Sequence, residues 1–162
     1  MPRVVLVHPQ IPPNTGNVAR TCAATGCELH LVEPLGFEIS DRQLRRAGLD
    51  YWPLVDLHRH ACLEAFLRER RRLGGRMLAL SARAEAVYSE FRFQHDDWLL
   101  FGREADGLPD DLLATADARL TIPMRPAGVE AEPSVRSLNL SVSVGVVLFE
   151  ALRQLRSTAP QP

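Results

Sequence analysis

Residues 4–26 read VVLVHPQIPPNTGNVARTCAATG, and this stretch points to the fold class. Its first four residues form a short apolar run of the kind that is buried in a parallel sheet. The prolines that follow end the strand. From residue 15 to residue 25 the apolar and small residues Val18, Cys22 and Ala23 recur at helical spacing, and Gly26 supplies a helix stop. A buried strand is therefore predicted to lead through a loop into a helix.

The same alternation continues along the chain. Further strands are predicted at residues 29–32, 54–57, 77–80, 98–101 and 120–122, and further helices at 41–47, 62–73, 110–116 and 138–155. This order indicates an α/β fold with a mostly parallel sheet and helices on both faces. The Pro-, Gly-, Ala- and Glu-rich segment 125–136 predicts an exposed loop. We expect one domain over residues 1–156 and a frayed tail over 157–162.

Composition limits the function classes. The 162 residues carry 19 basic and 20 acidic side chains, so the chain has no overall positive charge that would indicate nucleic-acid binding. Any RNA-binding site must therefore be a local one. All the basic residues are arginines, which excludes Schiff-base and Walker-type lysine chemistry. Three cysteines are too few for a disulfide framework and suit a reducing compartment, so we expect a cytoplasmic protein. No run of 18 apolar residues predicts a membrane span.

Several familiar fingerprints are absent. No G-x-G-x-x-G follows the first strand, and residues 102–108 have Walker-like glycine spacing but Leu108 where the lysine must stand. No G-x-S-x-G elbow occurs. His58, His60 and Cys62 alternate and could share one face as metal ligands, but no second ligand pair follows them. We interpret them as a solvated strand-to-helix junction and expect no metal.

Three loop segments that end or follow apolar strands remain. NTGNVAR (residues 14–20) opens a helix, where side chains and backbone N–H groups could meet an anionic or ribose-bearing substrate, or could simply cap the helix. FGREADGLP (residues 101–109) has two glycines that permit either close approach of a ligand or a tight turn. IPM (122–124) and SLNLS (137–141) suit an adenine-sized pocket or a capped helix.

Together these segments resemble the three signature motifs of the SPOUT methyltransferases. Within that group, residues 11–17, 33–37 and 44–51 closely resemble the small tRNA (cytidine/uridine 2′-O)-methyltransferases that modify the wobble position. The resemblance spans about residues 4–155. It implies an α/β fold with a C-terminal trefoil knot, in which the last helix passes through a loop.

The resemblance also implies an activity. The chain would transfer the methyl group of S-adenosylmethionine to the ribose 2′-hydroxyl of cytidine or uridine 34 in the tRNA anticodon stem-loop, as a cytoplasmic homodimer without metal. Motif matching places the cofactor in the knot, held mainly through backbone groups. The expected cofactor-binding residues are Leu80, Gly102, Ile122, Ser137 and Leu138.

The motif match assigns a catalytic role to Arg20. A guanidinium with a pKa above ~12 is an unattractive general base. Our hypothesis is that Arg20 clamps the substrate phosphate and stabilises the developing oxyanion, while Asn14, Asn139 and Ser141 orient the ribose. In the expected dimer, Arg20 of one subunit faces the cofactor of the other.

Two departures from the family pattern bear on the RNA substrate. Residues 103–106 read READ where close relatives carry PETR, and residues 125–136 form a longer segment that includes Glu130 and Glu132. Negative charge near a phosphate is unfavourable. Alternatives are therefore methylation of another tRNA position or of rRNA, or a non-catalytic RNA-binding module on the same fold.

Overall fold

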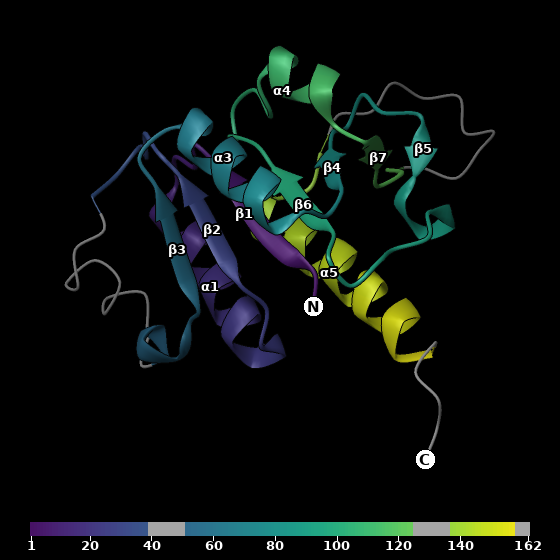
Figure 1. Ribbon diagram of the computed structural model, residues 1–162, viewed down its shortest axis with the longest axis horizontal. Coiled ribbons are helices and arrows are strands. Elements are labelled where there is room, and N and C mark those ends of the chain that lie inside the picture. Colours follow the sequence, from purple (N-terminus) through teal and green to yellow (C-terminus); the bar gives the residue numbers. More distant parts are fainter. Residues whose placement is uncertain (39–50, 125–136, 158–162) are drawn as a thin grey trace.

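The strands form one seven-stranded sheet in the computed structural model, which describes residues 1–38, 51–124 and 137–157 (Figure 1). The spatial order is β3-β2-β1-β6-β4-β7-β5, and every pairing is parallel. This confirms the predicted α/β class. The strands are β1 (Arg3–Val7), β2 (Leu29–Val32), β3 (Leu57–His60), β4 (Met77–Leu80), β5 (Ala86–Val87), β6 (Trp98–Phe101) and β7 (Ala118–Thr121).

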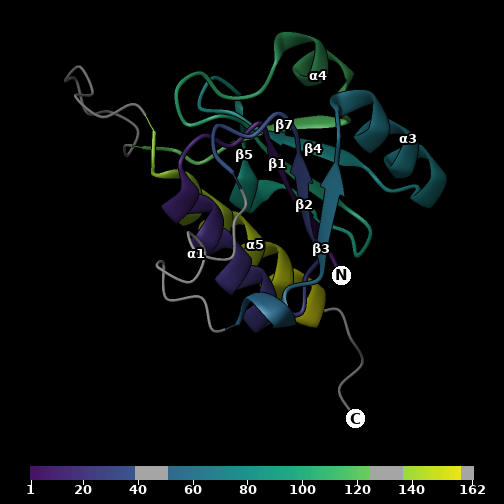
Figure 2. The same ribbon diagram turned by 90° about the vertical axis from the view of Figure 1, so that its left-hand side faces the viewer.

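Helices cover both faces of the sheet, as predicted (Figure 2). Helices α1 (Pro12–Thr25) and α5 (Leu140–Ser157) pack on one face, and α3 (Leu63–Leu73) and α4 (Asp110–Thr115) pack on the other. Alternate side chains of the central strands point to opposite faces, so the apolar core is divided into two clusters by the sheet. Two short 3-10 helices, η1 (Trp52–Leu54) and η2 (Tyr88–Glu90), complete the described elements.

Helix α1 begins three residues earlier than predicted. Pro12 and Pro13 occupy its first turn, where the missing N–H groups would have no helical partner in any case. The helix ends where the sequence indicates, at Gly26, which adopts a left-handed conformation with φ 68°. This early start carries Asn14 into the first turn of the helix and so fixes its direction.

The third strand was predicted three residues too early. Residues 54–57 were expected to form it, but β3 runs from Leu57 to His60, and η1 occupies residues 52–54. Pro53 suits the first turn of a helix and has no N–H to donate to a sheet, while the N–H of Val55 bonds to the carbonyl of Trp52 at 3.1 Å. The two-residue strand β5 was not predicted, because two residues carry no periodic signal.

The other described boundaries differ from the predictions by at most two residues, and α5 runs to Ser157, the first residue of the expected tail. The predicted helix 41–47, the predicted loop 125–136 and residues 158–162 lie outside the described residues. The knot depends on the path between Met124 and Ser137, so it stays a prediction, as does the single-domain organisation.

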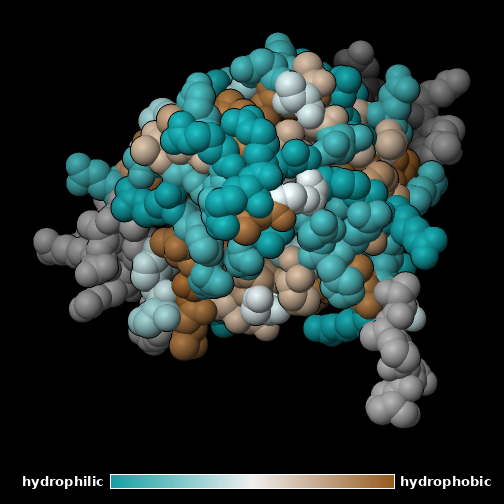
Figure 3. All heavy atoms as spheres, in the orientation of Figure 1, coloured by the Kyte–Doolittle hydropathy of each residue, from teal (hydrophilic) through white to brown (hydrophobic). Residues whose placement is uncertain are grey.

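The face of the molecule that carries α3 is mainly hydrophilic, with hydrophobic side chains in small separate groups (Figure 3). Among the described residues, no helix is both long enough and apolar enough to cross a bilayer.

Candidate active site

The residues predicted to hold the cofactor follow neighbouring strands. Leu80 ends β4, Gly102 follows β6 and Ile122 follows β7, and β4 lies between the other two strands in the sheet. Because the strands are parallel, all three residues lie at the carboxyl edge, where α/β sheets bind ligands. Ser137 and Leu138 are exposed and lie directly before Asn139 and the start of α5.

Gly102 lies beneath a tight turn. The N–H of Arg103 donates to the carbonyl of Gly107 at 3.1 Å, and the N–H of Gly107 donates back at 2.9 Å. A Cβ atom on Gly102 would lie only 2.0 Å from the carbonyl carbon of Gly107, whose φ is 80°. The tight turn that the sequence offered as one interpretation is therefore present, and it requires glycine at both positions.

Glu104 joins this turn to the start of α1. Its carboxylate accepts hydrogen bonds from the backbone N–H groups of Gln10 and Ile11, at 2.8 and 3.1 Å, and from Nδ2 of Asn14 at 3.1 Å. A negative charge is also favourable at the amino end of a helix. Glu104 thus fixes the loop before α1 and the Asn14 side chain together.

The same chain of hydrogen bonds continues to α5. Oδ1 of Asn14 accepts from Nδ2 of Asn139 at 2.9 Å. Oδ1 of Asn139 in turn accepts from the backbone N–H and from Oγ of Ser141, at 2.9 and 2.7 Å. We call Glu104, Asn14, Asn139 and Ser141 the polar network. The structure thereby brings together the three residues that were predicted to position the ribose.

The central role of Glu104 was missed by sequence reasoning. A carboxylate within the middle motif was visible in the sequence, but nothing there showed that it would bond to residues 90 to 94 positions earlier. Asn14 is buried, and its amide oxygen and nitrogen both have protein partners. The network is therefore held rigid by bonds among its own members.

Arg20 lies apart from the polar network of its own chain. It lies six positions after Asn14, which corresponds to about 9 Å along α1 and a rotation of about 240°. Its side chain is exposed, and its guanidinium carbon lies 5.0 Å from the centre of the Tyr51 ring. It forms no ion pair with any residue that the structure describes.

These features can be set beside known proteins. The model of the SpoU rRNA Methylase family matches residues 1–149. The chain belongs to the SpoU methylase family. A Synechocystis protein, provisionally named tRNA (cytidine(34)-2′-O)-methyltransferase, is 54% identical over 157 residues, which cover 97% of this chain and 99% of that protein. A Polaromonas protein named tRNA (cytidine(34)-2′-O)-methyltransferase is 47% identical over 153 residues, which cover 93% of this chain and 89% of that protein.

Solved structures of SpoU methylases and their relatives have the same fold. One, from work on 2′-OH methylation of C/U34 on tRNA, has a TM-score of 0.87 and 52% identity, covering 97% of both chains. An S-adenosylmethionine-bound rRNA methyltransferase of Sinorhizobium meliloti has a TM-score of 0.81 and 29% identity, covering 95% of this chain and 56% of that one. The fold is therefore shared with proteins described as tRNA and rRNA methyltransferases.

Proposed function

We propose that this SpoU methylase transfers the methyl group of S-adenosylmethionine to the ribose 2′-hydroxyl of cytidine or uridine 34 in tRNA. The observation that carries the proposal is the polar network, which links the three motif segments at the carboxyl edge through Glu104, Asn14 and Asn139. The names of relatives that are about half identical to this chain support the tRNA substrate. No metal ion is needed for this reaction.

The residues at the carboxyl edge fit an adenosine. Leu80 and Ile122 are half-buried apolar side chains, and Leu138 is a partly exposed one. Gly102 adds a backbone surface without a side chain. Flat apolar walls with nearby backbone donors and acceptors suit a purine ring. We infer that these residues and Ser137 would hold S-adenosylmethionine, which supplies an electrophilic methyl group when bound.

The protein's own contribution is positioning. A 2′-hydroxyl must be placed in line with the methyl group, and its proton must leave. Asn14 and Asn139 are held rigid by the polar network, which suits them to fix the edge against which the ribose lies. Arg20 is free of carboxylate partners among the described residues, so its guanidinium is available to a phosphate and to the developing oxyanion.

The distance of Arg20 from its own chain's network supports a homodimer. Val142 and Phe149 are 50% and 56% exposed and lie seven residues apart, so they share one face of α5. Helix α5 packs beside α1, which carries Arg20. We propose that a second copy covers this apolar face and that Arg20 of each subunit serves the site of the other.

The activity test uses tRNA from a strain that lacks this gene. Purified protein and S-adenosylmethionine should produce a 2′-O-methylated cytidine or uridine, which nucleoside mass spectrometry and mapping would place at position 34. Arg20→Ala should abolish methylation with cofactor affinity nearly unchanged. The matched control is Arg71→Ala, which removes an exposed arginine on α3. Methylation of rRNA alone would refute the proposed substrate, and loss of cofactor binding by Arg20→Ala would refute its role.

The dimer has a separate test. Neither Arg20→Ala nor Asn139→Ala should be active alone, but heterodimers of the two contain one intact site if Arg20 acts across the interface. A randomly mixed population should then recover about a quarter of wild-type activity. No recovery would place Arg20 in its own subunit's site. Phe149→Asp should shift the protein to monomers in sedimentation, and an unchanged dimer would exclude the α5 face.

A further inference from the structure

A second polar cluster lies at the opposite edge of the sheet. Glu28 precedes β2, His30 is the second residue of β2, and His58 is its paired neighbour on β3. One potential ligand atom from each of these residues lies within 4.8 Å of the other two. These residues lie at the amino ends of their strands, whereas the candidate active site lies at the carboxyl ends. The reaction proposed above does not use them.

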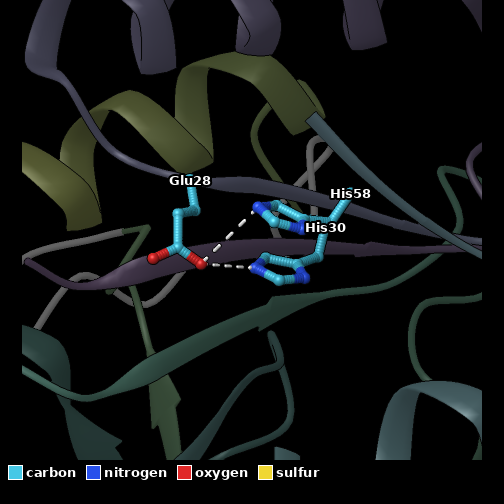
Figure 4. A group of neighbouring side chains, drawn as sticks. All are labelled: Glu28, His30 and His58. Atoms are coloured by element: carbon cyan, nitrogen blue, oxygen red, sulfur yellow. Dashed lines mark hydrogen bonds and ion pairs between the residues drawn. The ribbon is translucent and has the colours of Figure 1, made fainter. Parts of the chain in front are cut away.

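Both histidines point a ring nitrogen at the same carboxylate (Figure 4). Oε2 of Glu28 lies 3.0 Å from Nε2 of His30 and 3.9 Å from Nε2 of His58. The two imidazole rings are stacked, with centres 4.5 Å apart and planes 11° from parallel. Tetrahedral zinc with ligand bonds of 2.0–2.1 Å requires ligand atoms about 3.4 Å apart. The two measured separations lie on either side of that value.

His58 supplies an independent sign of a ligand. Its Nε2 atom is buried and makes no well-aligned hydrogen bond, although a carboxylate lies within contact distance. Oδ1 of Asp56, an exposed residue, lies 3.0 Å from this atom and offers a fourth ligand. Buried polar atoms almost always have a partner, so an atom without one needs an explanation. A metal ion between the carboxylates and the two imidazoles would provide that partner.

We propose that Glu28, His30 and His58, with Asp56 as a fourth ligand, bind a divalent transition-metal ion such as Zn²⁺. Two imidazole nitrogens and two carboxylate oxygens are a ligand set that suits zinc. The site goes beyond the proposed methyl transfer and would fasten the amino ends of β2 and β3, next to the open edge of the sheet.

His60 completes the surroundings of the site. Its Nε2 lies 2.9 Å from Nδ1 of His30, so His30 can donate its Nδ1 proton to His60 while Nε2 binds a metal. Without metal, the His30 proton moves to Nε2 and bonds to Glu28, and His60 then donates to Nδ1.

Two features of the surroundings govern how a metal ion would reach the site and which cation would compete with it. His58 and His60 line a cavity of about 590 Å³ between β3 and α3, which gives an ion a path from solvent. The guanidinium of Arg3 lies 3.2 Å from Oε2 of Glu28 and is the competing cation. Arg3→Gln should therefore raise the metal affinity.

The test is titration of the untagged, chelator-treated protein with Zn²⁺ in a calorimeter. We expect one ion per chain, and Co²⁺ should give the visible spectrum of a tetrahedral nitrogen–oxygen site. His58→Ala and Glu28→Gln should each lower affinity at least tenfold, and His60→Phe should lower it about 10–100-fold. His95→Ala, which removes an exposed histidine elsewhere, should leave it unchanged.

Three outcomes would overturn the site. These are no saturable binding by the wild-type protein, binding that His58→Ala leaves intact, or a Co²⁺ spectrum dominated by thiolate charge transfer, which would assign the ion to a cysteine. The Co²⁺ spectrum is read on the wild-type protein, so it decides the matter even if a variant fails to fold.

Discussion

Replacing Gly102 by alanine tests how the turn at the carboxyl edge of the sheet is built. The added Cβ would lie 2.0 Å from the carbonyl carbon and 2.3 Å from the carbonyl oxygen of Gly107, and 2.1 Å from the nitrogen of Leu108. Ordinary contact begins at 3.4 Å, so this backbone must move by about 1.4 Å. Backbone atoms cannot rotate away as the end of a flexible side chain can.

The energetic cost follows from what that movement breaks. Two hydrogen bonds join Arg103 and Gly107, and each contributes about 1 kcal/mol. Leu108 is buried in the cluster beneath α3 and α4, and exposing it costs about 1.5–3 kcal/mol. Gly102→Ala should therefore lower the free energy of unfolding by about 3–5 kcal/mol, a large part of the ~5–15 kcal/mol typical of a domain.

Urea unfolding followed by circular dichroism measures this loss, and calorimetry with S-adenosylmethionine measures the accompanying fall in cofactor affinity, which we expect to exceed tenfold. Gly107→Ala is the matched control in the same turn. Its φ of 80° is unfavourable for alanine by about 1–2 kcal/mol, but its Cβ would meet nothing within 4 Å. If Gly102→Ala is no less stable than Gly107→Ala, the packing argument is wrong.

Two further predictions concern stability and thiol reactivity. Asp97 is fully buried and accepts two hydrogen bonds from Arg76, so Asp97→Ala should cost about 2–4 kcal/mol in urea unfolding. Arg72→Ala breaks an exposed ion pair on α3 that solvent screens, so its loss of stability should be far smaller. Equal losses would contradict this ranking. Burial raises the pKa of the Cys22 thiol to about 12, so at pH 8 an aromatic disulfide reagent should label the half-buried Cys62 rapidly and Cys22 only after unfolding. Rapid labelling of Cys22 in the native protein would contradict its burial.

The sequence predicted the strands that lie in the middle of the sheet well, because burial on both faces leaves a continuous apolar run. Residues 4–7, 29–32, 77–80 and 98–101 are such runs, and each forms the expected strand. The edge strand β3 carries His58 and Arg59 instead, so its signal was weak and the apolar residues before it were mistaken for it. The position of a strand, in the middle of the sheet or at its edge, therefore decided how well the sequence predicted it.

The candidate site was predictable in its members but not in its connections. Asn14, Asn139 and Ser141 were identified by motif, and the structure bonds them to one another. The hydrogen bond from Asn14 to Glu104 depends on β1 and β6 being neighbours in the sheet. No local sequence pattern reveals that pairing. The cluster of Glu28, His30 and His58 was missed for the same reason, since it forms only when β2 and β3 pair in register.

During synthesis, strand β1 can pair early with β2 but not with its other neighbour in the sheet. Its neighbour β6 lies more than 90 residues later, and the Asn14–Asn139 hydrogen bond spans 125 residues. Such high contact order is typical of folding in milliseconds to seconds. At ~5–20 residues per second, a ribosome needs roughly 6–25 s to follow Asn14 with Asn139, and throughout that time the apolar face of α1 lacks α5. A chain that stops before α5 has every strand of the sheet and no assembled site.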